Sequence, residues 1–259
     1  MISIHYLRKP YGLLSLFIVI SCLYMQSCSP NSNNSGNDQA LSRDEINEMI
    51  RNYISQNPEV IEGALQKLQE RAVNAYQKNQ ERLVSRFFNE LTNDDRDPSF
   101  GKKSARVQII FFTDYRCPFC KLTSKWLWET FNINRGDIRV VVKELPVLGT
   151  GSTQAAKASL AIFGLAPSTY IAFHEAVMNT TGQVNQTQLN AIMLDLGLDI
   201  ELIQKRMAEV SISQHLADTQ ALARDLGVNG TPFFIINGSV FSGADINKLQ
   251  KKVDENIGL

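Results

Sequence analysis

The most restrictive feature of the sequence is an apolar run that leads directly into a pair of cysteines. Residues 106–113 (RVQIIFFT) are mostly β-branched, aromatic or otherwise apolar, which favours a buried strand. Residues 114–116 turn the chain, and Cys117-Pro118-Phe119-Cys120 opens a segment with helical character to about residue 131. The sequence therefore predicts a strand, a short loop and a helix that begins at the cysteine pair, as in an α/β fold.

The position of the two cysteines indicates reversible redox chemistry. The N-terminus of a helix presents unpaired amides and the positive end of the helix dipole, and both favour a thiolate. Pro118 suits the first turn because it lacks an N–H group that would have no partner there. The spacing brings both sulfurs to one helix end. We expect Cys117 to be the exposed, attacking sulfur and Cys120 the shielded, resolving sulfur, with Pro118 and Phe119 as supporting residues.

Composition argues against the main alternatives for this pair. The 259 residues include four cysteines and three histidines, and only Cys117 and Cys120 lie beyond the N-terminal region. A zinc site needs about four ligands, and a structural disulfide in so short a ring adds little loop entropy. We expect neither a metal nor a cofactor. Because 26 basic residues balance 26 acidic ones, no whole-chain charge favours nucleic acid as a partner.

Residues 1–28 have the pattern of a signal peptide or a lipoprotein signal. Two basic residues precede an apolar stretch at residues 11–20, as in a secretory signal. Cys22 and Cys28 each end a lipobox-like tetrapeptide, so lipidation at either site, simple cleavage and a retained anchor are the alternatives. The Asn- and Ser-rich residues 29–41 predict a disordered tether. We expect the remainder to lie in the periplasm, either lipid-anchored to the membrane or free.

Residues 42–95 predict a helical arm. Ser42 and Glu45 form a capping box for a first helix that ends near residue 54. Asn57-Pro58 predicts the N-cap and first turn of a second helix of about 30 residues. Its apolar residues recur at three- and four-residue spacing, and this stripe needs burial on the catalytic domain or in a homo-oligomer. The polar residues 93–101, with proline and glycine, predict a linker.

The second half of the chain alternates strand and helix patterns. Residues 138–143 (IRVVVK) predict a second buried strand, and Pro232 opens a third within residues 228–238. Asn237-Gly238 predicts a hairpin turn, and a cap at residues 242–245 predicts a final helix. Between the second and third strands, helices are expected at residues 155–163, 169–178, 186–196, 200–209 and 212–226.

Three segments together resemble the DsbA group of the thioredoxin superfamily: FFTDYRCPFC, KELP and GTPFFIING, in that order. The likeness is strongest for bacterial members with an N-terminal helical extension, some of which look like surface antigens. It covers the chain from about residue 104 and implies a thioredoxin-like fold in residues 96–259, with a helical domain inserted at about 150–226. It further implies that Pro232 is cis beside the cysteine pair and that Thr231 docks an extended substrate peptide.

The sequence departs from this family at several positions. Many relatives carry a buried glutamate six residues before the first cysteine, where this chain has Phe111. That role is vacant or passes to Asp114 or Glu144, although a charged residue beside a strand end is usually solvated. Lys143 matches a family lysine near the active site, and a lysine that extends from the strand end to solvent is the alternative. Thr231 is commoner in the isomerase and reductase-like branches than in the principal oxidase.

The resemblance implies an enzyme that exchanges thiols and disulfides in exported proteins. Our leading hypothesis is a periplasmic oxidase that forms disulfides in cysteine-containing substrates and is recycled by a membrane redox partner. A dimeric disulfide isomerase or a reductase is the alternative, favoured by Thr231 and by the arm. A non-catalytic surface lipoprotein with a vestigial fold is a further alternative, and slow reaction of Cys117 with alkylating agents would favour it.

Overall fold

The structure is a computed structural model that describes residues 41–181 and 184–258. The predicted signal at residues 1–28 and nearly all of the tether lie outside the described residues. The chain divides into two compact units, one ending at Pro58 and one beginning at Glu59.

The first unit contains helix α1 (Arg43–Gln56). The predicted capping box is confirmed: the Ser42 hydroxyl accepts from the Glu45 amide at 3.2 Å, and the Glu45 carboxylate accepts from the Ser42 amide at 2.8 Å. The predicted N-cap role of Asn57 is wrong. Asn57 is instead the C-cap of α1, because its backbone and side-chain N–H groups both donate to the Tyr53 carbonyl.

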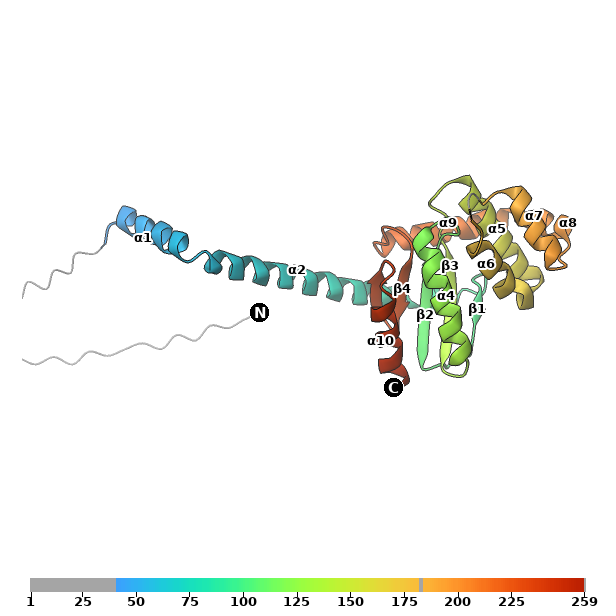
Figure 1. Cartoon of the computed structure of the whole chain (residues 1–259), viewed down its shortest axis with the longest axis horizontal. Helices are drawn as coiled ribbons and strands as arrows, with labels where there is room; N and C mark the ends of the chain where they lie inside the picture. Colours follow the sequence, from blue (N-terminus) through green and yellow to red (C-terminus); the bar gives the residue numbers. More distant parts are fainter. Residues whose placement is uncertain (1–40, 182–183, 259) are drawn as a thin grey trace, which may run out of the picture. The chain divides into compact units, whose positions relative to one another are not determined.

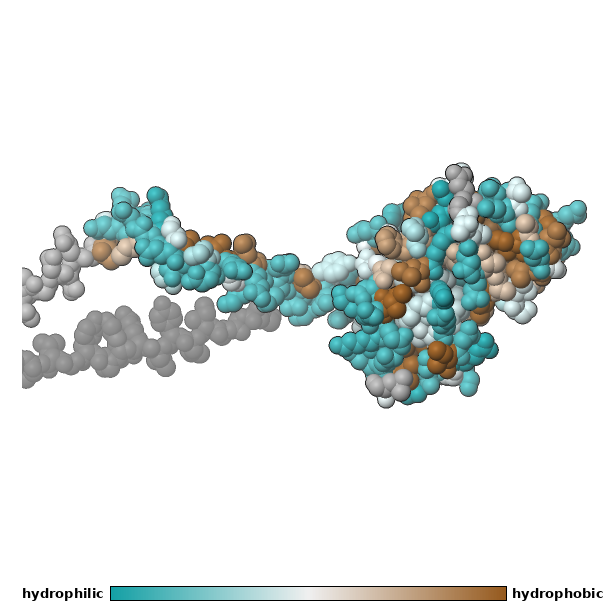
Figure 2. Space-filling model, in the orientation of Figure 1, coloured by the Kyte–Doolittle hydropathy of each residue, from teal (hydrophilic) through white to brown (hydrophobic). Residues whose placement is uncertain are grey.

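The second unit begins with the long helix α2 (Glu59–Arg86), followed by the short helix α3 (Phe88–Thr92). Gln80 and Val84, near the C-terminal end of α2, are buried. The earlier turns are exposed, and Figure 2 shows hydrophobic residues on the surface of this segment. The predicted helix is therefore present, but only its C-terminal end packs against the rest of the unit. No helix in residues 41–181 and 184–258 combines the length and apolar character needed to cross a membrane.

A five-stranded mixed sheet forms the centre of the second unit (Figure 1). Strand β2 is central: it pairs in parallel with β3 on one side and antiparallel with β4 on the other. The sheet order is β1-β3-β2-β4-β5. The strands are β1 (Ser99–Phe100), β2 (Val107–Thr113), β3 (Ile138–Glu144), β4 (Phe233–Ile236) and β5 (Ser239–Ser242).

Alternate residues of β2 and β3 point to opposite faces of the sheet, and both faces are covered. Ile109 and Phe111 belong to the larger core, which includes side chains of the helix after the cysteines and of the inserted helices. Ile110 and Phe112 belong to a smaller core with Val84 of α2. Burial on both faces explains why these strands read as continuous apolar runs.

The helices of the second unit follow the predicted order. Asn237 and Gly238 form the predicted two-residue turn between β4 and β5, with positive φ angles of 44° and 85°. Helix α4 (Pro118–Ile133) follows the cysteine loop, and α10 (Ile246–Ile257) ends the fold. Between β3 and β4 lie α5 (Thr150–Leu165), the 3₁₀ turn η1 (Pro167–Thr169), α6 (Tyr170–Met178), α7 (Gln186–Asp195), α8 (Ile200–Met207) and α9 (Val210–Asp225).

The interpretation of residues 93–101 as a linker is wrong, because this segment packs into the fold. The buried Asp97 carboxylate pairs with the Lys143 amine, and its other oxygen lies 3.0 Å from Nε2 of His215. Phe100 in β1 packs edge-on against Trp128, with ring centroids 5.4 Å apart. These partners are distant in the sequence, so local composition gives no indication of them.

The interpretation of Lys143 as a solvated strand-end lysine is also wrong. Lys143 is buried, and its amine donates to Asp97 and to the backbone carbonyl of Glu90. The neighbouring Arg139 donates to the carbonyl of Thr92 at 2.8 Å. Two cations of β3 therefore bind α3, and Lys143 also binds Asp97 in the segment that joins α3 to β1, which fixes the base of the arm to the sheet.

Replacing Lys143 with methionine is expected to lower the free energy of unfolding by about 3–5 kcal/mol, because Asp97 then stays buried without its lysine partner. The double variant Lys143→Met/Asp97→Asn should recover part of that loss, since it removes the unpaired charge. Urea unfolding followed by circular dichroism measures both effects.

Lys103→Met is the matched control. The Lys103 amine lies on the surface, 3.9 Å from Asp95, and its loss should change stability by less than about 1 kcal/mol. Equal, small effects at both lysines would contradict a stabilising buried pair.

Candidate active site

The cysteine pair lies where β2 turns into α4. Cys117 is the N-cap residue of α4, with extended backbone angles, and Pro118 is the first helical residue. The Cys117 amide donates to the Asp114 carbonyl at 3.1 Å, which closes the turn. Both cysteines are free thiols. The sulfur of Cys117 thus lies at the end of the helix that stabilises negative charge.

Exposure differs along the motif. Cys120 is fully buried and Cys117 is 5% exposed, so the order of exposure is as predicted, although Cys117 is less accessible than expected. Phe119 is 60% exposed. The motif therefore presents a nearly covered sulfur beside an exposed aromatic ring.

Strand β4 brings the second predicted segment to the same place. Its antiparallel pairing with β2 sets Phe233 opposite Phe112, so the residues just before β4 lie beside the cysteine loop. The Thr231-Pro232 peptide bond is cis, as the family resemblance implied. The thiol of Cys117 donates to the Thr231 carbonyl at 3.2 Å. Thr231, Pro232 and Cys117 thus form one cluster.

The two thiols have opposite electrostatic surroundings. The hydrogen bond from the Cys120 thiol is the main cause that lowers the pKa of Cys117 to about 6. The amides of Cys120 and Phe119 and the Thr231 hydroxyl add to this effect, while burial opposes it. Burial is the main cause that raises the pKa of Cys120 above its ordinary value. Near neutral pH the reduced pair therefore holds a thiolate at Cys117 and a thiol at Cys120.

Asp114 is buried and hydrogen-bonded, which corrects the expectation of a solvated carboxylate. Its Oδ2 accepts from the amides of Val147 and Leu148 at 2.8 and 3.0 Å. Its Oδ1 accepts from the Arg116 amide and the Ser152 hydroxyl at 2.8 and 2.7 Å. Asp114 therefore fastens the loop after β3 to the cysteine loop.

Glu144 at the end of β3 is also buried, which again corrects the expectation of solvation. The hydroxyls of Ser159, Tyr115 and Tyr170 lie 2.6, 3.0 and 3.2 Å from its Oε1. Burial raises the pKa of Glu144 to about 8, although these hydrogen bonds act in the opposite direction. At neutral pH the carboxyl group is mainly protonated.

The polar cluster continues from Glu144 to α4. The Tyr115 hydroxyl lies 2.9 Å from Nδ1 of His174, and Nε2 of His174 lies 2.8 Å from the Ser124 hydroxyl. These residues are not apparent as a group in the sequence, because they come from separate elements and no local motif connects them. Together they tie the inserted helices to the cysteine loop and to α4.

Phe111 occupies the position at which many relatives carry a glutamate. Its ring is fully buried and stacks on Phe234, with ring centroids 4.6 Å apart and planes 12° apart. Phe234 in turn packs edge-on against Trp126 of α4. The position is therefore part of an aromatic core beneath the cysteines, and it carries no titratable group.

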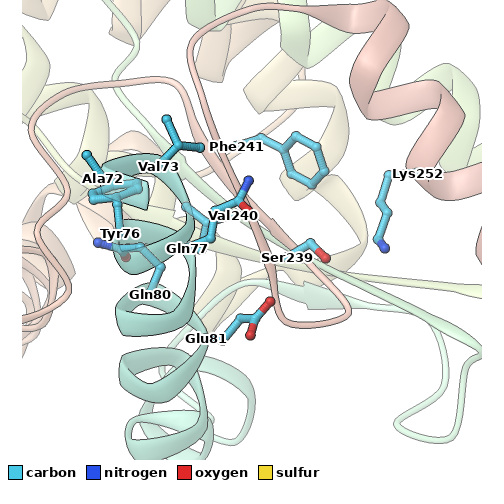
Figure 3. A pocket seen from close by; sticks show the side chains of 10 residues that line it. All are labelled: Ala72, Val73, Tyr76, Gln77, Gln80, Glu81, Ser239, Val240, Phe241 and Lys252. Atoms are coloured by element: carbon cyan, nitrogen blue, oxygen red, sulfur yellow. The ribbon is translucent and has the colours of Figure 1, made fainter. Parts of the chain in front are cut away.

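A further feature of the second unit lies away from the cysteines. A groove of about 760 Å³ runs between α2 and β5 (Figure 3), and its lining includes Tyr76 and Phe241.

In the described part of the chain, no cluster of three or more His, Cys, Asp or Glu residues is arranged to hold a metal ion. The free cysteines of the described residues are Cys117 and Cys120.

A dithiol that begins a helix, directly after the central strand of a mixed sheet and beside a cis-proline, defines a thiol–disulfide oxidoreductase with a thioredoxin-like fold. The chain belongs to the family of the DsbA-like thioredoxin domain, whose model matches residues 108–254. The model of the copper resistance protein ScsC N-terminal domain matches residues 43–75, within the arm.

Individual relatives agree with this assignment. The chain is similar to disulfide bond formation protein D of Bacillus subtilis, with 22% identity over 62% of this chain and 77% of the relative. It resembles the thiol-disulfide exchange protein alpha-DsbA2 of Wolbachia pipientis, with 32% identity, a TM-score of 0.65, and coverage of 70% and 97% of the two chains. A linker-deletion mutant of Proteus mirabilis ScsC matches with 26% identity, a TM-score of 0.64, and coverage of 85% and 99%.

Titration of the reduced protein should show Cys117 ionising near pH 6, well below the value of about 8.5 for an ordinary cysteine. Ultraviolet thiolate absorbance measures this transition. Cys117→Ser should abolish it. Cys120→Ala should move it upward, because the thiol that stabilises the Cys117 thiolate is lost. A wild-type midpoint above about pH 8 would contradict the assigned stabilisation.

Proposed function

We propose that the protein is a periplasmic protein-disulfide oxidase that transfers the Cys117–Cys120 disulfide to exported proteins. The observation that carries this proposal is the low pKa of Cys117, held at the N-terminus of α4 beside the Cys120 thiol. A thiol of low pKa is a good leaving group, so a disulfide that contains it is readily passed to a substrate.

The exchange proceeds in two balanced steps. A substrate thiolate attacks the Cys117 sulfur, the Cys117–Cys120 bond breaks, and Cys120 leaves as a thiolate and takes up a proton. A second substrate thiolate then attacks the substrate sulfur of the mixed disulfide and expels the Cys117 thiolate. The substrate dithiol is oxidised and the enzyme pair is reduced, so a membrane redox partner must remove the two electrons.

Substrate docking uses the groups around Cys117. Thr231 and Pro232 offer backbone next to the sulfur for an extended peptide, as the DsbA resemblance implies. Phe119, Val147 and Leu148 are 60%, 48% and 43% exposed and provide apolar contacts around it. These contacts place a cysteine-containing segment over an otherwise nearly covered sulfur.

The proposal that the protein is exported rests on the sequence of residues 1–28, which lie outside the described residues. A signal of this kind directs the chain to a compartment in which disulfides persist. Lipidation at Cys22 or Cys28 would tether the enzyme to the membrane, and simple cleavage would release it. Either outcome gives the pair access to exported, cysteine-containing proteins.

Disulfide isomerase or reductase activity is the second candidate function, favoured by Thr231 beside the cysteine pair and by the arm. In that role the resting enzyme is the dithiol, and the Cys117 thiolate attacks a wrong disulfide in the substrate. The same geometry serves both directions, so the reduction potential of the pair decides between them.

Oxidised wild-type protein is expected to form disulfides in reduced ribonuclease, and Cys117→Ser is expected to be inactive because the attacked sulfur is absent. Ribonuclease activity and thiol titration measure the product. The refolding of scrambled ribonuclease and the reduction of insulin test the alternative. Rapid rescue of scrambled ribonuclease with weak oxidation would make the protein an isomerase, and activity equal to that of Cys117→Ser in all three assays would exclude both roles.

We further propose that the arm forms a homo-oligomer. Ile61, Leu65 and Leu68 of α2 are 44%, 60% and 59% exposed and lie on one face of the helix. The stripe continues to Tyr76, beside the groove next to β5 (Figure 3). A stripe of this kind is buried when it pairs with the same stripe of another copy.

Leu65→Glu/Leu68→Glu is expected to reduce the mass measured by light scattering to that of a monomer, because two carboxylates cannot be buried in an apolar seam. Gln66→Glu/Asn74→Asp places two charges on other faces of α2 and should leave the mass unchanged. The catalytic domain should stay folded in both variants. A monomeric wild-type protein would contradict the proposed oligomer.

A further inference from the structure

A small pocket lies next to the contact between Cys117 and the cis-proline loop. It has a volume of about 320 Å³ and is formed by three segments. One wall is the loop after β3, which includes Val147; another is the C-terminal half of α9; the third is the loop at residues 228–230. No local motif of the sequence identifies these segments as a unit, because they come from distant parts of the chain.

Two walls of the pocket are linked to Cys117 through one intervening residue each, Thr231 and Asp114. Gly230 immediately precedes Thr231, whose carbonyl lies 3.2 Å from the Cys117 sulfur. Val147 donates its amide to the Asp114 carboxylate, and the Asp114 carbonyl accepts from the Cys117 amide. A peptide that reaches Cys117 along Thr231 therefore passes the mouth of this pocket.

The lining combines an apolar interior with a cationic rim. Leu145 and Ala223 are buried, and Val147 is about half exposed. Gln220 and Arg224, one turn apart on α9, are exposed at the edge. No acidic side chain lines the pocket.

The positive charge at the rim is the guanidinium group of Arg224. Within residues 41–181 and 184–258, no carboxylate lies within salt-bridge distance of the Arg224 guanidinium. The guanidinium also makes no side-chain hydrogen bond among those residues. A carboxylate from a bound molecule is thus complementary to the rim.

We propose that this pocket recognises a glutamate of the substrate, located two residues from the cysteine that reacts with Cys117. The methylene groups of the glutamate contact Val147 and Ala223, and its carboxylate pairs with Arg224. Residues two apart in an extended peptide point to the same side, so the glutamate and the cysteine face the enzyme together. This inference rests on the proposed exchange at Cys117 and adds a substrate preference to it.

The test uses the reduced full-length protein and capped peptides whose cysteine is joined by a disulfide to thionitrobenzoate. The Cys117 thiolate attacks the cysteine sulfur of the peptide, the peptide–thionitrobenzoate bond breaks, and the coloured thiolate leaves. Stopped-flow absorbance gives the second-order rate constant. The peptides carry glutamate, glutamine or lysine two residues before or two residues after the cysteine. N-acetylcysteine amide with the same leaving group reports the intrinsic reactivity of Cys117.

At one of the two positions, before or after the cysteine, the glutamate peptide is expected to react about two- to fivefold faster than the lysine peptide, as for an exposed ion pair. Arg224→Glu should reverse this order and leave the rate with N-acetylcysteine amide unchanged. Arg135→Glu is the matched control, because Arg135 lies beyond the far end of α4 and should preserve the wild-type preference.

The possible failures are distinguishable. The glutamate and lysine peptides could react at equal rates at both positions while the thionitrobenzoate disulfide of N-acetylcysteine amide reacts fast. That result would overturn the pocket assignment and leave the exchange at Cys117 intact. The same preference in Arg224→Glu as in the wild type would also overturn it. Slow reaction of N-acetylcysteine amide, equal to that of an ordinary thiol, would instead contradict the proposed function.

Discussion

The pairing of β2 with neighbours on both sides is the constraint on which the rest of the structure depends. Its parallel register with β3 sets Thr113 opposite Glu144, and its antiparallel register with β4 sets Phe112 opposite Phe233. Three chain segments therefore meet at one edge of the sheet: the cysteine loop, the end of β3 and the cis-proline loop. A slip of one residue in either pairing would turn the apolar side chains to the wrong faces, so burial on both faces maintains the register.

This edge holds two buried carboxyl groups that behave differently. Asp114 accepts hydrogen bonds from backbone amides on two loops, and it uses them to hold these loops together. Burial raises the pKa of Glu144 to about 8, so that group is mainly neutral at pH 7. A neutral Glu144 places no full negative charge near the Cys117 thiolate, which is consistent with the low pKa of Cys117. Since the folded pKa of Glu144 is above the unfolded value, its burial costs stability as the pH rises towards 8.

Local sequence patterns predicted the elements of this site, while its long-range contacts needed the structure. The strand before Cys117, the helix after it and the Asn237-Gly238 turn each follow from residues that are adjacent in the chain. The cis form of Pro232 followed from family resemblance. In contrast, Lys143 finds its partner Asp97 46 positions away, and Glu144 is buried by hydroxyls from α5 and α6. Charged residues next to a strand look solvated until the elements that cover them are known.

The buried contacts of Lys143 and Arg139 also connect the C-terminal part of the arm to the sheet that carries the cysteine pair. The backbone carbonyls of Glu90 and Thr92 in α3 each accept a hydrogen bond from a cation of β3, so α3 packs against the sheet. Helix α2, which carries the apolar stripe, and the cysteine pair therefore belong to the same folded unit. Truncation before residue 95 would remove these carbonyls, so the buried Arg139 would lose the Thr92 carbonyl and Lys143 would keep only Asp97. Surface substitutions on α2 avoid that damage, so a change they cause in activity would test the proposed association between copies.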